Sequence, residues 1–173
     1  MRTIKGIMFF SILLLLWLCQ CQYHLLGKEL KLPGGVSRIY VEPARNGTLE
    51  AGLEQVFTQR LLEHLQADGR VKLVKKDEAE AVLRTEVFQA RDQSLSFDQF
   101  GRVTLIQVQV SASATLIASK ENQKLWDTGI LQDREQYPVG DDFLRNDQLR
   151  KMALNQASIR LSRIIVEMLT SDF

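Results

Sequence analysis

The chain has 173 residues, of which 45% are hydrophobic and 25% charged, a composition ordinary for one modest globular domain. Its 22 basic and 21 acidic residues nearly balance, so we expect no general attraction to nucleic acid. No internal repeat, nucleophile elbow, Walker-type phosphate loop or His-Glu-x-x-His motif is present, so the sequence does not predict an enzyme. The remaining route to catalysis is a pair of carboxylates that folding brings together.

The first residues have the pattern of an export signal. Arg2 and Lys5 precede an almost wholly apolar run over residues 7–18. At about 1.5 Å of helix rise per residue, this run reaches only about 18 Å, well short of the roughly 30 Å hydrocarbon core of a membrane. A processed or anchored signal is therefore expected instead of a transmembrane helix.

Cys21 follows this run in the position of an acylated lipoprotein cysteine. The preceding residues lack the small side chains of an ordinary secretory cleavage site, whereas Leu18, three positions before Cys21, suits a lipoprotein signal. Gln20 departs from that pattern, in which a small residue usually precedes the cysteine. Cys19 is the rival acceptor but follows bulky Trp17 and Leu18, and both cysteines could also be plain parts of an apolar signal tail.

The predicted organisation has three parts: a cleaved lipoprotein signal peptide over residues 1–20, an acylated N-terminus and tether over residues 21–35, and a single domain over residues 36–173. Loss of Arg2 and Lys5 with the signal leaves 20 basic against 21 acidic residues. The domain itself would hold no cysteine and hence no disulfide. A Cys-x-Cys metal site with His24 is the alternative, but no further cysteine or histidine lies near it in the sequence.

The first half of the domain predicts a strand, a helix and two more strands. Residues 36–41 read as a strand that ends before Asn46 and Gly47. The next segment has an apolar stripe at helical spacing and a C-cap at Gly69, with Asn46 or Thr48 expected to cap its first amides. The stripe consists of Leu53, Val56, Phe57, Leu61, Leu62 and Leu65. Strands follow at 70–74 and, after a polar turn, at 81–90.

The second half predicts a hairpin, a last strand and a long helix. Residues 94–102 read as a hairpin connection, 103–119 as the clearest strand and 124–132 as the last one. A helix that begins at Asp141 or Asn146 carries a stripe of Leu149, Met152, Ala153, Ala157, Leu161, Ile164, Ile165 and Met168. The predicted fold class is α+β, with two helices packed on one face of a mixed four- to five-stranded sheet in the order β-α-β-β-β(-β)-α.

Three features of this half are candidate contact surfaces. One face of the strand at 103–119 is polar without charge and must meet water or a polar partner; it consists of Leu105, Gln107, Gln109, Ser111, Ser113 and Thr115. Leu95, Phe97 and Phe100 lie at the hairpin tip, where local packing and partner contact are both open. Arg91, Arg102 and Arg160 are basic residues suited to phosphate, which the sequence does not rank.

Several short motifs, in order along the chain, resemble one family. They are Cys21-Gln-Tyr23-His24-Leu25-Leu-Gly27, Leu32-Pro33, residues 46–54, Asp68-Gly69-Arg70, Ala79-Glu-Ala81-Val-Leu83 and Leu125-Trp126. Together they resemble the lipopolysaccharide-assembly lipoprotein family LptE, the outer-membrane partner of the barrel LptD. Gln22 and Leu26 depart from the Cys-Gly-Tyr/Phe-His-Leu-Arg-Gly run of that family.

The resemblance implies a non-enzymatic lipoprotein of the cell outer membrane, anchored through acyl chains on Cys21 and facing the periplasm and a barrel lumen. Its implied partner is an LptD-like β-barrel, which it would help to assemble, and its implied role is the delivery of lipopolysaccharide to the outer leaflet. Direct contact with lipopolysaccharide stays open, and no cofactor, metal or nucleic acid is implied. The alternatives are a lipoprotein adaptor of another envelope complex and a lipid-anchored periplasmic hydrolase.

Overall fold

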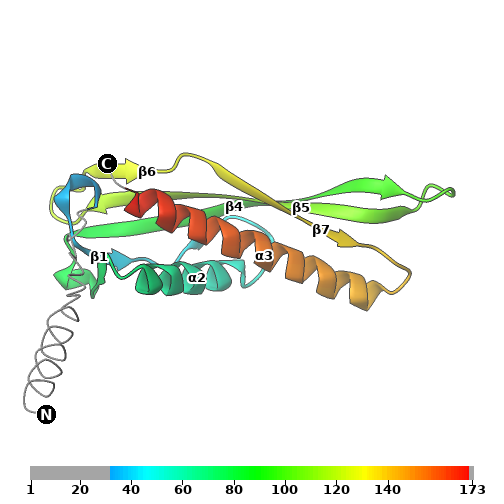
Figure 1. The fold of residues 1–173 in the computed structure, drawn as a ribbon, viewed down its shortest axis with the longest axis horizontal. Helices are drawn as coiled ribbons and strands as arrows, with labels where there is room; N and C mark the ends of the chain where they lie inside the picture. Colours follow the sequence, from blue (N-terminus) through cyan, green and yellow to red (C-terminus); the bar gives the residue numbers. More distant parts are fainter. Residues whose placement is uncertain (1–31, 172–173) are drawn as a thin grey trace, which may run out of the picture.

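Two long antiparallel strands set the length of the molecule in this computed structural model, which describes residues 32–171. The elements in chain order are η1 (Pro33–Gly35), β1 (Arg38–Val41), β2 (Arg45–Asn46), α2 (Leu53–Asp68), β3 (Lys72–Leu73), η2 (Lys76–Glu78), β4 (Ala81–Phe97), β5 (Val103–Ala118), β6 (Lys124–Asp127), β7 (Leu131–Pro138) and α3 (Phe143–Thr170). β4 and β5 form a hairpin whose tip projects beyond both helices (Figure 1).

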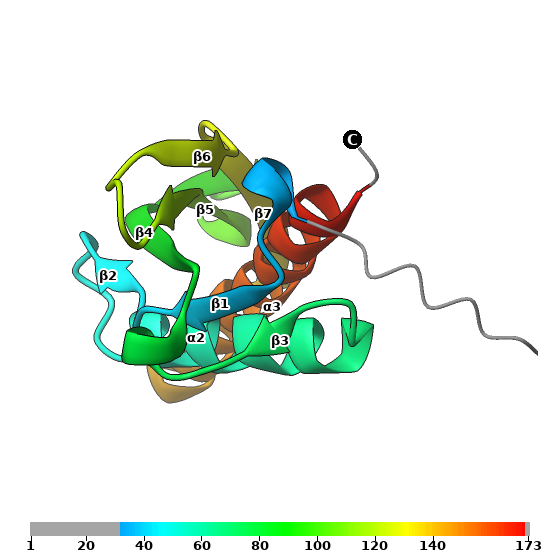
Figure 2. The same ribbon diagram turned by 90° about the vertical axis from the view of Figure 1, so that its left-hand side faces the viewer.

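The strands form one mixed sheet. Its order is β3-β1-β4-β5-β6, with β2 beside β4 and β7 beside β5. β1 is parallel to both β3 and β4, whereas β5 is antiparallel to β4, β6 and β7. Viewed along the long axis, the strands follow an arc beside α2 and α3 (Figure 2). The predicted α+β class is confirmed, although the sheet has seven strands where four or five were expected.

The strands differ from the prediction in three main ways, besides being shorter by one to three residues at several ends. β4 continues to Phe97, so the hairpin connection is only residues 98–102. The expected strand at 124–132 is instead two strands, because the chain turns at Gly129, which has φ +62° and donates its N–H to Asp127 Oδ1 at 3.0 Å. The strand β2 was not predicted because its two residues are too few to show the alternation of apolar and polar side chains by which a strand is recognised.

The helix α2 buries the predicted stripe through Leu53, Phe57, Leu61 and Leu65. Gly69 is its C-cap, with φ +69° and its N–H bonded to the Leu65 carbonyl, as expected. The predicted N-cap is wrong, since Gly52 occupies that position without a side-chain hydrogen bond. The polar side chains before it build a turn instead, in which the Asn46 side-chain oxygen accepts from the amide of Thr48.

The helix α3 buries pairs of residues at every fourth position. They are Ala153 and Leu154, Ala157 and Ser158, Leu161 and Ser162, Ile165 and Val166, and Leu169 and Thr170. Toward the start of the helix, the same spacing places Leu149 and Arg150 on the inner face. Met152 falls outside this pattern and is 61% exposed, so its assignment to the apolar stripe is wrong. The buried hydroxyls of Ser158 and Thr170 donate to carbonyls of the preceding turn, which satisfies them inside the core.

The described chain enters the domain at the end opposite the hairpin tip. Leu32 is buried there. The segment η1 packs against β6, where the backbone of Gly34, which has φ +80°, lies directly over the side chain of Leu125. A methyl group at Gly34 would come within 2.8 Å of Leu125 Cδ2. Figure 1 shows this proximal end, which comprises η1, β3 and the β5–β6 turn, on the left and the tip on the right.

Candidate functional site

The outer half of the sheet carries a polar surface, which we call the amide face. Three consecutive rows cross β4, β5 and β7 with side chains directed away from α3. These rows are Gln89–Ser111–Gln132, Arg91–Gln109–Arg134 and Gln93–Gln107–Gln136. Eight of the nine residues are at least partly exposed, and the buried one, Ser111, has no hydrogen-bond partner for its hydroxyl oxygen in the described structure. The predicted polar face of β5 is thus part of a three-strand surface.

The amide face contains two cations and no carboxylate. Arg91 and Arg134 flank Gln109, whose side-chain oxygen accepts from Arg134 Nε at 2.9 Å. Arg91 lies against the side-chain amide oxygen of Gln89. No carboxylate among residues 32–171 forms an ion pair with either guanidinium, so this surface presents positive charge among neutral amides.

Three acidic residues of the same strands, Asp92, Asp133 and Glu135, lie on the other face, where α3 binds them. Arg160 contacts Asp133 at 2.7 Å and Glu135 at 2.6 Å, both from β7. Arg150 contacts Asp92 of β4 at 2.7 Å and also binds both carboxylate oxygens of Glu50, at 2.7 and 2.9 Å. The hydrogen bonds from Arg150 lower the pKa of Glu50 below its usual value. These two arginines therefore hold α3 under the outer half of the sheet.

The far end of the molecule is apolar and exposed. Phe97 and Phe100 of the hairpin and Phe143 and Leu144 of α3, which we call the distal tip, are between 59% and 80% exposed. Exposed large apolar side chains at one end of a molecule can mark a contact site. Leu95 is also exposed, at 37%. Of the two alternatives that the sequence left open for this hairpin tip, the structure therefore does not support packing of Leu95, Phe97 and Phe100 against their own strands.

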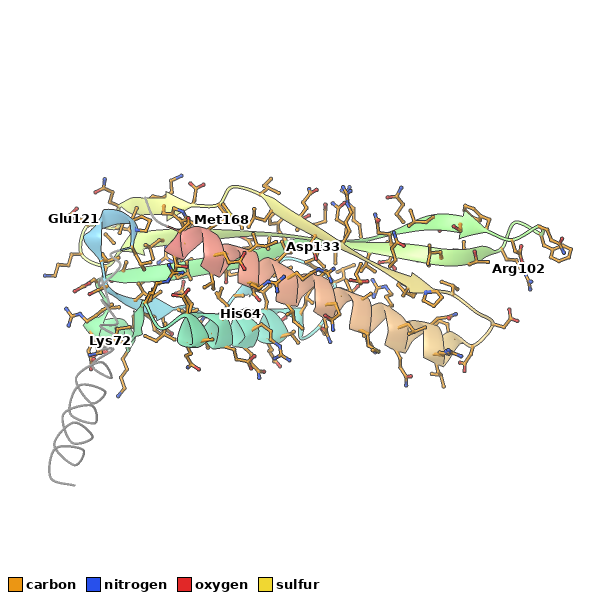
Figure 3. The ribbon with its side chains drawn as sticks, viewed as in Figure 1. His64, Lys72, Arg102, Glu121, Asp133 and Met168 are labelled. Atoms are coloured by element: carbon orange, nitrogen blue, oxygen red, sulfur yellow. The ribbon has the colours of Figure 1, made fainter. Side chains whose placement is uncertain are left out.

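The hairpin turn at this tip is held in shape by one aspartate. Asp98 Oδ1 accepts from the amides of Phe100 and Arg102, at 2.8 and 3.0 Å, and its Oδ2 accepts from Arg102 Nε at 2.7 Å. The backbone amide of Arg102 is the main cause that lowers the pKa of Asp98. The Arg102 guanidinium also lies 5.7 Å from the Phe100 ring centre, and Figure 3 shows it at the extreme end of the molecule.

The structure separates the three basic candidates. Arg160 is bound to two carboxylates and Arg102 to Asp98, so both have structural partners. Arg91 alone of the three faces outward without an acid. Sequence reasoning missed Arg134, which occupies the equivalent place on β7, because that strand was not recognised. Cys21, the predicted lipid attachment residue, and His24 lie outside the described residues.

The described residues contain neither a metal-ligand cluster nor a membrane-spanning helix. Residues 32–171 contain no group of three or more His, Cys, Asp and Glu side chains arranged to hold a metal ion. Among the same residues no helix has the length and apolar character required to cross a membrane. The exposed amide face and the exposed apolar side chains of the distal tip favour a contact function.

Comparisons with known proteins agree with this fold. No curated protein sequence is similar enough to count as a relative. The chain resembles the solved structures of rare lipoprotein B from Shewanella oneidensis (14% identity, covering 78% of this chain and 94% of that one, TM-score 0.58) and of a minor lipoprotein from Acinetobacter baumannii (17%, 79% and 92%, 0.58). A putative lipoprotein from Caulobacter crescentus is also similar (14%, 75% and 89%, 0.52).

At these identities the structural likeness shows the fold alone. The family model named LptE, described as lipopolysaccharide-assembly, matches residues 36–171, which is most of the chain and nearly all of the described domain. The order of the short motifs, the fold and this match agree, and the chain belongs to the LptE family of lipopolysaccharide-assembly proteins.

Proposed function

We propose that this chain is a non-enzymatic lipoprotein of the outer membrane that docks in an LptD-like β-barrel, helps that barrel to assemble and supports delivery of lipopolysaccharide to the outer leaflet. Acyl chains on Cys21 anchor it, and one thioether-linked diacylglyceryl group with an amide-linked chain exceeds the two-signal requirement for stable attachment. Membership of the LptE family supports the role in lipopolysaccharide assembly.

The amide face is the observation that supports docking in a barrel. The lumen of an outer-membrane barrel is polar, unlike its lipid-facing wall. A subunit inside it needs a surface that forms many hydrogen bonds without burying unpaired charge of both signs. The amide face provides this because its strands direct Asp92, Asp133 and Glu135 to the other side, where arginines of α3 bind them.

The distal tip supplies an apolar contact at the end of the same hairpin. Aromatic side chains dominate binding energy at protein interfaces when a partner covers them. The hairpin carries Phe97 and Phe100 beyond the helices, on the side of the molecule away from the chain entry at Leu32. The tip is therefore placed to reach a partner while the opposite end stays near the anchor.

A tagged pull-down from detergent-solubilised outer membrane tests this function. We expect one large barrel to remain bound in stoichiometric amount after a stringent wash and to change its gel mobility on heating. Phe100→Ser should reduce barrel recovery about fivefold or more, the effect of losing an aromatic contact worth over about 1 kcal/mol. Ile130→Ser is the control, since Ile130 is 67% exposed but lies away from the tip.

Recovery of the chain alone would contradict docking in a barrel. It would direct attention to an adaptor of another envelope complex or to a hydrolase. Equal losses with Phe100→Ser and Ile130→Ser would show that the distal tip is no special contact.

A further inference from the structure

One edge of β4 loses its partner halfway along the strand. β1 pairs with Ala81–Leu83 and β2 with Glu86 and Val87, after which Gly47 donates to the Val87 carbonyl and the chain turns away. From Gln89 to Ser94, β4 pairs with β5 in unbroken register, and no other strand of the described chain pairs with this segment. Irregular register bounds the segment at both ends.

This edge can still form main-chain hydrogen bonds. In an antiparallel pair, alternate residues direct their N–H and C=O groups away from the partner strand. About half of the segment therefore offers backbone donors and acceptors to a new neighbour, over roughly 20 Å at about 3.3 Å per residue. An unpaired edge of this kind is a template for another strand.

A groove lies beside the first part of the edge. Its volume is about 410 Å³, and it runs between the loop that follows β2 and residues 88–92 of β4. Leu49 is fully exposed on the loop side, and Phe88 lines the strand side. The groove thus occupies the place that β2 would fill if it continued along β4, and it offers an apolar side chain to whatever enters.

The charges around the groove leave one cation without an acidic partner among the described residues. Glu50, Asp92 and Arg150 all line it, but Arg150 binds both carboxylates. Arg91 also lines it, and no carboxylate of the described residues pairs with Arg91. On a neighbouring strand, an acidic side chain opposite Arg91 would form a favourable cross-strand pair.

We propose that the edge from Gln89 to Ser94 is a strand-addition site for an extended segment of the barrel partner. The segment pairs with the free backbone groups, places a carboxylate beside Arg91 and packs an apolar side chain against Leu49. This inference rests on the proposed function, because it takes the barrel as the partner. The edge borders the amide face, so both surfaces would meet the same partner.

A second copy of the chain fits less well as the occupant. A second copy paired antiparallel through the same edge would place Arg91 against Gln89, Arg91 and Gln93 of its mate, with no acid among them. Six paired residues also fall short of the roughly 1,200–2,000 Å² that stable dimers bury.

Photo-crosslinking in the intact complex tests the proposal. p-Benzoylphenylalanine is introduced singly at three edge positions and at the matched control positions of the same rows on β7, and the crosslinked peptides are mapped by mass spectrometry. The edge positions are Gln89, Arg91 and Gln93, and the controls are Gln132, Arg134 and Gln136. We expect the edge positions to crosslink to one barrel segment at sites two residues apart, in consecutive order, and the controls to lack such a ladder.

Charge reversal tests the pair at Arg91. With the crosslinker at Gln93, Arg91→Glu should lower the yield about fivefold, as expected for replacing an attractive cross-strand pair by a repulsive one. Arg134→Glu reverses an equivalent charge on β7, which pairs only with β5 and borders the opposite side of the amide face, and should leave that yield unchanged.

Each other outcome overturns the proposal. A barrel that co-purifies but gives scattered crosslinks, or equal effects of the two reversals, removes the strand-addition site and leaves docking intact. Crosslinks to a second copy of the chain replace the barrel as occupant. Failure of any barrel to co-purify removes the proposed function and, with it, the partner assumed here.

Discussion

Replacement of Arg150 by Met should loosen the outer half of the sheet from α3. Arg150 joins three segments that are distant in sequence, since it binds Glu50 before α2 and Asp92 on β4 from its own place on α3. Met preserves the apolar stem of the side chain but removes the four hydrogen bonds that the guanidinium donates to Glu50 and Asp92. Two carboxylates are then left close together without a counter-ion.

The expected loss follows from the geometry and the exposure. Hydrogen bonds to charged groups contribute about 1.5–3 kcal/mol each when well buried. Here the side chains are 25% exposed for Arg150, 25% for Glu50 and 33% for Asp92, so solvent weakens the interaction. We expect the free energy of unfolding to fall by about 2–4 kcal/mol, which for a domain of this size lowers Tm by about 6–12 °C.

Thermal unfolding followed by circular dichroism measures this change. Arg163→Met is the control, because Arg163 also lies on α3 but contacts Glu167 at only 3.7 Å with both side chains more than half exposed. It should cost less than about 0.5 kcal/mol. Equal shifts in the two variants would refute the reasoning. Adding Glu50→Gln and Asp92→Asn to Arg150→Met should restore part of the loss, because the repulsion between the carboxylates is removed.

Three further changes have defined outcomes. The amides of Ser37 and Arg38 lower the pKa of Glu80 from its ordinary value of 4.5 to about 2, so the stability that they contribute is present above pH 4.5 and is lost as pH falls toward 2. In acid titrations of the free energy of unfolding, Glu80→Gln should flatten this loss, whereas the control Glu121→Gln, on an exposed turn, should not. Leu161→Ala should cost about 2–5 kcal/mol in urea unfolding, since the side chain is wholly buried, and a cost below 1 kcal/mol would contradict its place in the core. Cys21→Ser should abolish palmitate labelling and leave an unprocessed chain, whereas undiminished labelling would move the anchor to Cys19.

The parts of the fold that were predictable are those in which burial and sequence pattern agree. α2 combines a stripe of large apolar residues with Gly69 at its end, and β5 alternates Val108, Val110 and Ala112 with polar neighbours. In each case the side chains that face the core are apolar, so periodicity alone shows the inner face.

The longer strand segments that the sequence did not predict have acidic side chains on the face that packs against α3. Along β7, Asp133 and Glu135 face α3 while Arg134 faces outward, so both sides of the strand carry charge and the segment resembles a solvated loop. What makes the inner acids tolerable is Arg160, 27 residues away from Asp133 in sequence. In the same way, Asp92 faces α3 on the outer part of β4, where Arg150 binds it, so the alternation of apolar and polar residues expected of a strand is absent there. The amide face could not be found before these long-range pairs were known.

The entry of the chain at the proximal end limits how the domain can stand relative to a membrane. If Cys21 carries the acyl chains, the segment from there to Leu32 reaches at most about 38 Å at roughly 3.5 Å per residue. β4 alone has 17 residues and extends about 56 Å at about 3.3 Å per residue. The segment between Cys21 and Leu32 is thus shorter than the hairpin. The hairpin tip can therefore lie far from the anchoring leaflet, whereas the proximal end cannot.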